Sequence, residues 1–165
     1  MIKKILFAVA FFALGSSLLH ATPLGLGTWV EAPFGATGTT VGGSPYTFND
    51  STPVVFTITD IEFPGDQFSV FDNGVFVGST NPVTAIASTL CTTDANCLAS
   101  SLYSHGEFTL GAGPNSVVIK VINSPFNSGD VAFRIDAAAT PEPASLFLLS
   151  TGLLGVGLLV KSKVS

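Results

Sequence analysis

The chain has 165 residues, of which 47% are hydrophobic, and its 11 acidic and six basic side chains give a net charge of −5. Most of the basic residues lie near the chain ends, so residues 22–140 carry ten acidic and two basic side chains, a net charge of −8. A segment with this charge repels nucleic-acid phosphates and anionic membranes. The composition therefore excludes a nucleic-acid-binding protein.

The first 21 residues have the pattern of a secretory signal peptide. Lys3 and Lys4 precede an apolar stretch at residues 5–14, and the small residue Ala21 precedes the expected mature chain. We predict cleavage by signal peptidase after Ala21, or a few residues away because Leu19 suits the enzyme poorly. An uncleaved membrane anchor is the alternative, and a ten-residue apolar stretch is short for a membrane span.

Residues 22–139 form the expected folded domain, and their composition favours β-structure. Ser, Thr, Gly, Asn, Val and Phe are abundant, and no long stretch has helical apolar periodicity. Short strands separated by turns predict an all-β fold, an antiparallel β-sandwich that is jelly-roll-like, flanked by a signal helix and a short transmembrane helix. Clear alternation marks residues 54–59, 67–72, 75–78, 116–122 and 130–136, and weaker strands are predicted at 27–31, 46–49, 83–87 and 107–110.

Local patterns within this domain predict several details. Residues 54–59 place alternate apolar side chains on one face, and the phase changes near Asp60, so a strand break or bulge is expected there. Asn73 and Gly74 separate two apolar runs and predict a tight hairpin, because both positions of such a turn need positive φ. The odd-numbered residues of 117–121 and 131–135 are expected to face inward. Residues 22–27 and 137–140 are interpreted as linkers.

The chain has two cysteines, Cys91 and Cys97, six residues apart in a polar loop. After export they meet oxidising conditions, so we predict a structural disulfide. Closing so small a loop stabilises the fold by roughly 2 kcal/mol in the chain-entropy model. A redox or metal-binding role would need closer spacing or more ligands.

The domain offers few candidates for catalysis. His105 is its single histidine and follows Ser104, but neighbours on a strand point to opposite faces, so the two do not form a base and nucleophile. No motif of a serine hydrolase, zinc protease or phosphate-binding loop occurs. We therefore expect no enzyme, no catalytic residue and no cofactor. An acidic pair of a polysaccharide hydrolase stays an open alternative.

Two binding interpretations also stay open. Asp60, Glu62 and Asp66 surround a Pro-Gly turn and could gather hard oxygen ligands for a structural calcium ion, although EF-hand spacing is absent. Solvated loop carboxylates are the simpler interpretation. Trp29 is the best candidate for an exposed aromatic that stacks on sugar, as in a carbohydrate-binding module, whereas Phe residues at alternating positions belong to the core.

Residues 140–165 have a three-part pattern. Pro141, Glu142 and Pro143 form a stiff, extended peptide with one charge. The 17 apolar residues at 144–160 would extend about 25 Å as a helix, against about 30 Å of bilayer hydrocarbon. Lys161 and Lys163 then keep the end of the chain on the cytoplasmic side.

This pattern resembles the PEP-CTERM sorting signal of Gram-negative bacteria. The resemblance implies transient insertion into the inner membrane, removal of the tail by an exosortase and an association with bacteria that make exopolysaccharide. The segments 66–74, 104–108 and 133–136 are similar to segments of secreted PEP-CTERM proteins, which implies a shared β-domain and no activity. A plain short membrane anchor is the alternative, and the Leu-Pro-x-Thr-Gly motif of cell-wall sortase substrates is absent.

We therefore predict a signal peptide at 1–21, a β-domain at 22–139 and a sorting tail at 140–165. The precursor is expected to be tethered to the inner membrane and the product to reach the cell surface or extracellular matrix. The predicted role is that of a non-enzymatic protein associated with exopolysaccharide. A secreted carbohydrate-binding module is the second interpretation, and a polysaccharide hydrolase is the third.

Overall fold

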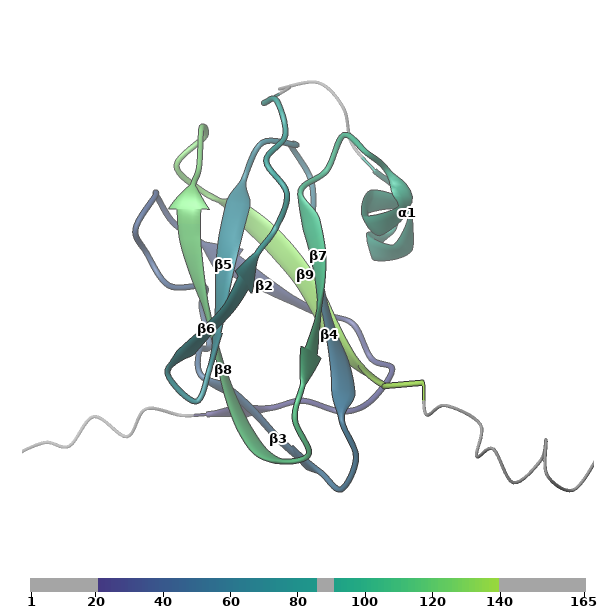
Figure 1. Cartoon of the computed structure of the whole chain (residues 1–165). Helices are drawn as coiled ribbons and strands as arrows, with labels where there is room; N and C mark the ends of the chain where they lie inside the picture. Colours follow the sequence, from purple (N-terminus) through teal and green to yellow (C-terminus); the bar gives the residue numbers. More distant parts are fainter. Residues whose placement is uncertain (1–20, 86–90, 140–165) are drawn as a thin grey trace, which may run out of the picture.

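The computed structural model describes residues 21–85 and 91–139, and within them nine strands form two sheets (Figure 1). Every neighbouring pair in these sheets is antiparallel except β1 and β3. This arrangement confirms the predicted all-β class. The first sheet contains, in spatial order, β1 (Thr22–Pro23), β3 (Tyr46–Asp50), β8 (Gly113–Asn123), β5 (Gln67–Asp72) and β6 (Val75–Ser79). The second contains β2 (Val30–Phe34), β9 (Gly129–Ala137), β4 (Val54–Asp60) and β7 (His105–Leu110).

The two sheets share one hydrophobic core. Aromatic rings from opposite sheets meet inside it: Phe34 and Phe68 have centroids 5.0 Å apart, and those of Tyr46 and Phe133 are 4.5 Å apart. The predicted inward residues of β4, β8 and β9 all belong to this core, as alternation along a strand requires. They are Val54, Phe56, Ile58, Val117, Ile119, Val121, Val131, Phe133 and Ile135.

The predicted turn and strand break are both present. Asn73 and Gly74 have φ values of 49° and 80° and connect β5 to β6, as a two-residue hairpin turn requires. The strand β4 ends at Asp60, after which Ile61 is buried and Phe63 is exposed. The change of apolar phase at Asp60 therefore marks the end of a strand.

Both predicted linkers are partly wrong. Thr22 and Pro23 form β1, which pairs in parallel with β3, and Leu26 makes an isolated bridge to Ile135. At the other end Ala137 still belongs to β9. A two-residue strand leaves no periodic signal, so only the tertiary pairing reveals it.

Two weaker strand predictions also need correction. The first is displaced, because β2 covers Val30–Phe34 rather than residues 27–31 and buries Ala32 and Phe34. Its Pro33 is tolerated because β2 is an edge strand. The second fails over residues 83–85, which are not strand. Residues 86–87, the signal peptide up to residue 20 and the tail at 140–165 lie outside the described residues.

A six-residue helix, α1 (Asp94–Ala99), lies where a polar loop was predicted. Figure 1 shows it beside the second sheet, on the side away from the first. The helix begins after Thr93, whose Oγ1 accepts a hydrogen bond from Asn96 N. This N-cap accounts for a helix too short to show apolar periodicity. Within the described residues no helix is long and apolar enough to span a membrane.

Candidate functional site

The helix α1 and the disulfide cover one end of the second sheet. Cys91 and Cys97 are joined as predicted, with their Cα atoms 5.3 Å apart, within the range that disulfides adopt. Cys97 is buried against Ile61 and Ala132, which face away from the main core. The segment therefore seals a second, smaller apolar cluster on the outer face of this sheet.

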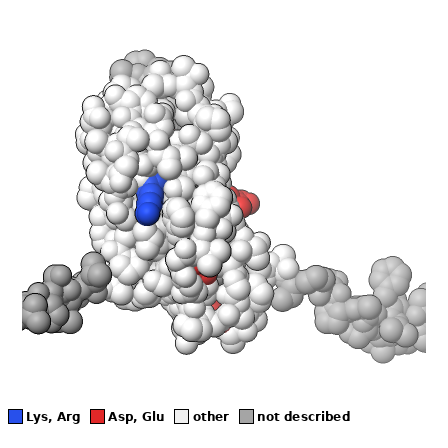
Figure 2. Space-filling model, turned by 60° about the vertical axis from the view of Figure 1, so that its left-hand side comes forward, with Lys and Arg blue, Asp and Glu red and all other residues white. Residues whose placement is uncertain are grey.

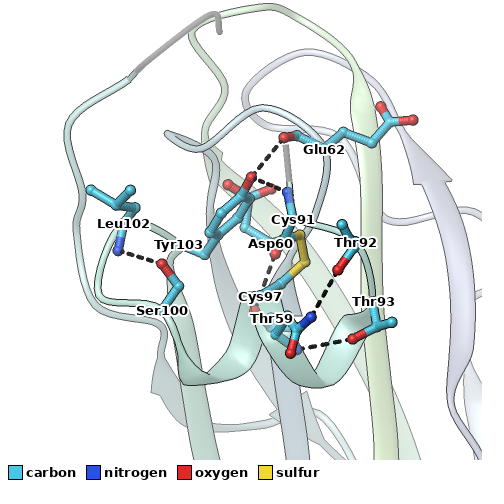
Figure 3. The surroundings of a disulfide bond; sticks show 11 residues. Thr59, Asp60, Glu62, Cys91, Thr92, Thr93, Cys97, Ser100, Leu102 and Tyr103 are labelled. Atoms are coloured by element: carbon cyan, nitrogen blue, oxygen red, sulfur yellow. Dashed lines mark hydrogen bonds between the residues drawn. A yellow bond between two sulfur atoms is a disulfide. The ribbon is translucent and has the colours of Figure 1, made fainter. Parts of the chain in front are cut away.

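Tyr103 connects this cover to the turn between β4 and β5 (Figure 3). Its side chain is 1% exposed, and its hydroxyl donates to the carbonyl oxygen of Glu62 at 2.9 Å. The same hydroxyl accepts a hydrogen bond from the Cys91 backbone N–H at 2.9 Å. One buried phenol thus holds together two loops that are far apart in sequence.

An acidic pocket opens beside the disulfide. Its volume is about 310 Å³, and its lining includes the carboxylates of Glu31, Glu62, Asp94 and Asp130 together with both cysteines. Burial raises the pKa of Asp94. The pocket concentrates negative charge at one end of the molecule, so it attracts cations and repels anionic ligands.

Next to this pocket, Asp60 and Asp66 are buried carboxylates. The Asp60 Oδ2 atom accepts hydrogen bonds from the backbone N–H groups of Gly65 and Asp66, both at 3.1 Å. Burial and, secondly, the charge of Asp66 raise the pKa of Asp60 to about 8. Burial also raises the pKa of Asp66, while the nearby hydroxyl of Ser124 acts to lower it. The turn between β4 and β5 is therefore folded around a carboxyl group.

Of the three carboxylates considered for a calcium ion, two are buried and one is exposed. Asp60 and Asp66 lie together, but Glu62 is exposed and lines the acidic pocket. Its φ of 68° places it at a sharp bend of the backbone. Among the described side chains, no group of three or more His, Cys, Asp or Glu residues could hold a metal ion.

Ser104 and His105 do not act on each other. The Nδ1 atom of His105 lies 2.9 Å from the Tyr103 carbonyl oxygen, and His105 is the first residue of β7. The buried Ser104 hydroxyl contacts Thr80 Oγ1 and the Asn81 carbonyl oxygen instead. This arrangement agrees with a strand-end histidine and a serine on opposite faces.

Trp29 is not the exposed aromatic that the sequence suggested. It is partly buried against the small apolar cluster, and the guanidinium carbon of Arg134 lies 4.7 Å from its ring centroid. Arg134 in turn forms an ion pair with Asp136 at 2.8 Å. The tryptophan is therefore covered on one side by a cation–π contact.

An exposed aromatic surface lies instead on the first sheet, around the β5–β6 hairpin. Val75 and Phe76 are 68% and 56% exposed, and the Phe76 ring packs edge-on against Phe71 with centroids 5.5 Å apart. Lys120 Nζ lies 5.0 Å from the Phe71 centroid. Figure 2 brings forward the side where Figure 1 labels β6 and β8, and its surface is largely uncharged. Sequence periodicity missed this surface because Phe was assigned to the core by default.

The residues of the predicted sorting signal lie outside the described part of the chain. They are Pro141, Glu142, Pro143, Lys161 and Lys163. Ala21, the predicted cleavage residue, is described and immediately precedes β1.

Comparison with known proteins identifies the tail. The model of the PEP-CTERM protein-sorting motif matches residues 139–162. No curated protein matches the chain in sequence.

Two solved structures show distant similarity to the chain. The pre-peptidase C-terminal domain of a collagenase from Bacillus anthracis is 13% identical, with a TM-score of 0.42 over 70% of this chain and 94% of that domain. The catalytic domain of a GH87 α-1,3-glucanase in complex with nigerose is 15% identical, with a TM-score of 0.30. The match covers 68% of this chain and 22% of the glucanase domain. Neither similarity is high enough to carry a conclusion about function.

Proposed function

We propose that this chain, a PEP-CTERM sorting-domain protein, is a non-enzymatic protein of the cell surface or extracellular matrix that is associated with exopolysaccharide. The main observation behind this proposal is the sorting motif at residues 139–162, which supports export, a membrane-anchored precursor and exosortase processing. The motif starts two residues after β9 ends at Ala137. The whole described β-domain therefore precedes the tail and would be released or retained as one unit.

The order of the strands supports a jelly-roll form of the predicted sandwich. From β2 to β9 the chain changes sheet at every step except between β5 and β6. With these eight strands renumbered from 1, the sheet orders are 1-8-3-6 and 2-7-4-5, and this order supports the jelly-roll proposal. Jelly rolls serve as lectin and capsid domains as well as enzyme scaffolds, so the fold by itself does not decide the function.

The strand pairing also separates the acidic pocket from the end of the domain where β9 ends. Asp60 pairs with Val131 near the start of β9, whereas Val54 pairs with Ala137 at its end. Six residues of strand extend about 20 Å. In a tethered precursor the acidic pocket and the disulfide would thus lie at the end of the domain farther from the membrane. That end would be accessible to extracellular polymers.

Mutation of the sorting motif tests the delivery step. In Glu142→Ala, the exosortase is expected to fail to recognise the tail, so mass spectrometry should find Lys161 and Lys163 retained and the protein in the membrane fraction. The control Glu107→Ala removes an exposed carboxylate of β7 and should be processed like the wild type. An unchanged mature C-terminus in Glu142→Ala would argue against processing through this motif.

Direct binding of polysaccharide is a second candidate function, favoured by the exposed aromatic surface. Apolar ring faces stack on sugars, and Phe76 lies exposed on an edge strand, where its ring packs against Phe71 rather than in the core. Co-sedimentation with exopolysaccharide from the producing bacterium should therefore fall in Phe76→Ala. The control Phe63→Ala removes another exposed phenylalanine, which lies in the β4–β5 turn and packs against Phe126. Equal binding by both variants, or none by the wild type, would remove this candidate.

A further inference from the structure

Two buried aspartates at the β4–β5 turn each have a carboxylate oxygen without a hydrogen-bond partner, Asp60 Oδ1 and Asp66 Oδ1. The hydroxyl of Ser124 lies beside the Asp66 carboxylate and acts to lower its pKa. Asp60, Asp66 and Ser124 are 0%, 2% and 6% exposed. Buried polar atoms are normally satisfied, so the two unpartnered carboxylate oxygens point to a missing ligand.

These three residues belong to two turns that are packed together. Asp60 and Asp66 flank the β4–β5 turn and are linked through the Asp66 N–H, which donates to Asp60 Oδ2. Ser124 begins the β8–β9 turn, directly after Asn123, whose Nδ2 donates to the Gly65 carbonyl oxygen at 3.0 Å. The two turns also touch through the rings of Phe63 and Phe126, with centroids 5.8 Å apart.

No side-chain cation of the described domain neutralises this pair. Its two basic residues are engaged elsewhere: Lys120 lies over Phe71, and Arg134 pairs with Asp136. Two buried carboxylates without a counter-charge are costly because the interior solvates charge poorly. A small hard cation would satisfy the unpartnered oxygens and the charge together.

We propose that Asp60, Asp66 and Ser124 bind one calcium ion that fastens the β4–β5 turn to the β8–β9 turn. Calcium accepts six to eight oxygen ligands in irregular geometry, so backbone carbonyls and water can complete the shell. Magnesium fits less well because it demands a near-ideal octahedron. The ion stabilises the end of the domain that also carries the acidic pocket, and this role is independent of the tail and of polysaccharide binding.

The test uses the exported protein, purified from culture and freed of metal with EDTA. Equilibrium dialysis against CaCl₂ should find one calcium per chain, with a Kd of about 10⁻⁴–10⁻³ M, as in other extracellular modules. Addition of 5 mM CaCl₂ should raise the thermal midpoint by about 5 °C, and the same concentration of MgCl₂ should raise it less. Absence of bound calcium in the wild type would overturn the proposal, leaving water as the occupant.

Variants distinguish this site from the acidic pocket. Asp66→Asn should weaken calcium binding at least tenfold, and Ser124→Ala, a milder change that keeps both carboxylates, should weaken it severalfold. The matched control Glu62→Gln alters the neighbouring pocket carboxylate and should leave binding unchanged. Loss of binding in Glu62→Gln with full binding in Ser124→Ala and Asp66→Asn would place the ion in the pocket and refute the assignment.

Discussion

Replacement of Asp60 by Asn tests whether a buried carboxyl group controls how stability depends on pH in the metal-free protein. Burial and the charge of Asp66 raise the pKa of Asp60 from 3.8 to about 8 in the folded state. The native state therefore holds this proton more tightly than the unfolded chain does. Its contribution to stability is complete below pH 4 and is lost as the pH rises from about 4 to 8.

The magnitude follows from the size of this pKa difference. Each pKa unit corresponds to about 1.4 kcal/mol, so a difference of about four corresponds to about 6 kcal/mol at most between pH 4 and 8. Domains of this size are typically stable by about 5–15 kcal/mol, which makes the loss large. The substituted asparagine side chain would keep an oxygen for the N–H groups of Gly65 and Asp66 and would carry no charge. The free energy of unfolding of Asp60→Asn should therefore fall much less over this range.

Urea unfolding in EDTA, followed by the fluorescence of Trp29, measures the effect. Trp29 is the single tryptophan and is partly buried, so its emission reports on unfolding. The two proteins should be similarly stable at pH 4, and Asp60→Asn should be more stable by several kcal/mol at pH 8. The control Glu107→Gln, exposed on β7, should follow the wild type. Parallel pH profiles for the wild type and Asp60→Asn would refute this reasoning.

Three further substitutions have definite expected outcomes in the same unfolding assay at pH 6. Tyr103→Phe removes a hydroxyl that satisfies two backbone groups and should cost about 2 kcal/mol; no measurable loss would show that water replaces it. Joint replacement of Cys91 and Cys97 by Ser should cost roughly 2 kcal/mol, and a reducing agent should have the same effect on the wild type but none on the variant. Gly78→Ala would place a methyl group against the Phe108 ring and should cost about 1–3 kcal/mol, unless the ring moves aside.

The part of the fold that sequence predicts is the part set by local alternation and turn chemistry. The inward residues of β4, β8 and β9 repeat with a period of two, and the Asn73–Gly74 turn needs backbone conformations that few other residue pairs adopt. The parallel pairing of β1 and the displaced β2 depend on partners distant in sequence. No local pattern reports such partners.

The candidate sites were harder to predict because burial, rather than residue type, defines them. Carboxylates around a Pro-Gly turn resemble surface loop residues, yet Asp60 and Asp66 lie inside while Glu62 lies outside. Likewise, Trp29 is partly covered by Arg134, and Phe76 is exposed although Phe usually belongs to the core. Which face of a strand or turn meets solvent depends on how the two sheets pack.

The start of the mature chain provides a final prediction, because β1 begins directly after the expected cleavage residue Ala21. Thr22 N donates to the Pro45 carbonyl oxygen and Thr22 Oγ1 to that of Gly43, both at 3.0 Å, and Leu24 N donates to Thr47 O at 2.9 Å. Cleavage after Ala21 preserves all three bonds, since the new terminal amine of Thr22 still donates.

A chain that starts at Gly25 would lose these hydrogen bonds and the packing of Leu24 on the main core. At about 0.5–1.5 kcal/mol for each bond, it should be less stable than the chain that starts at Thr22 by about 2–4 kcal/mol. Mass spectrometry of the exported protein should accordingly find Thr22 as its first residue. A mature N-terminus beyond Leu24, or equal stability of the two chains, would show that β1 contributes nothing to the fold and places no limit on where signal peptidase cuts.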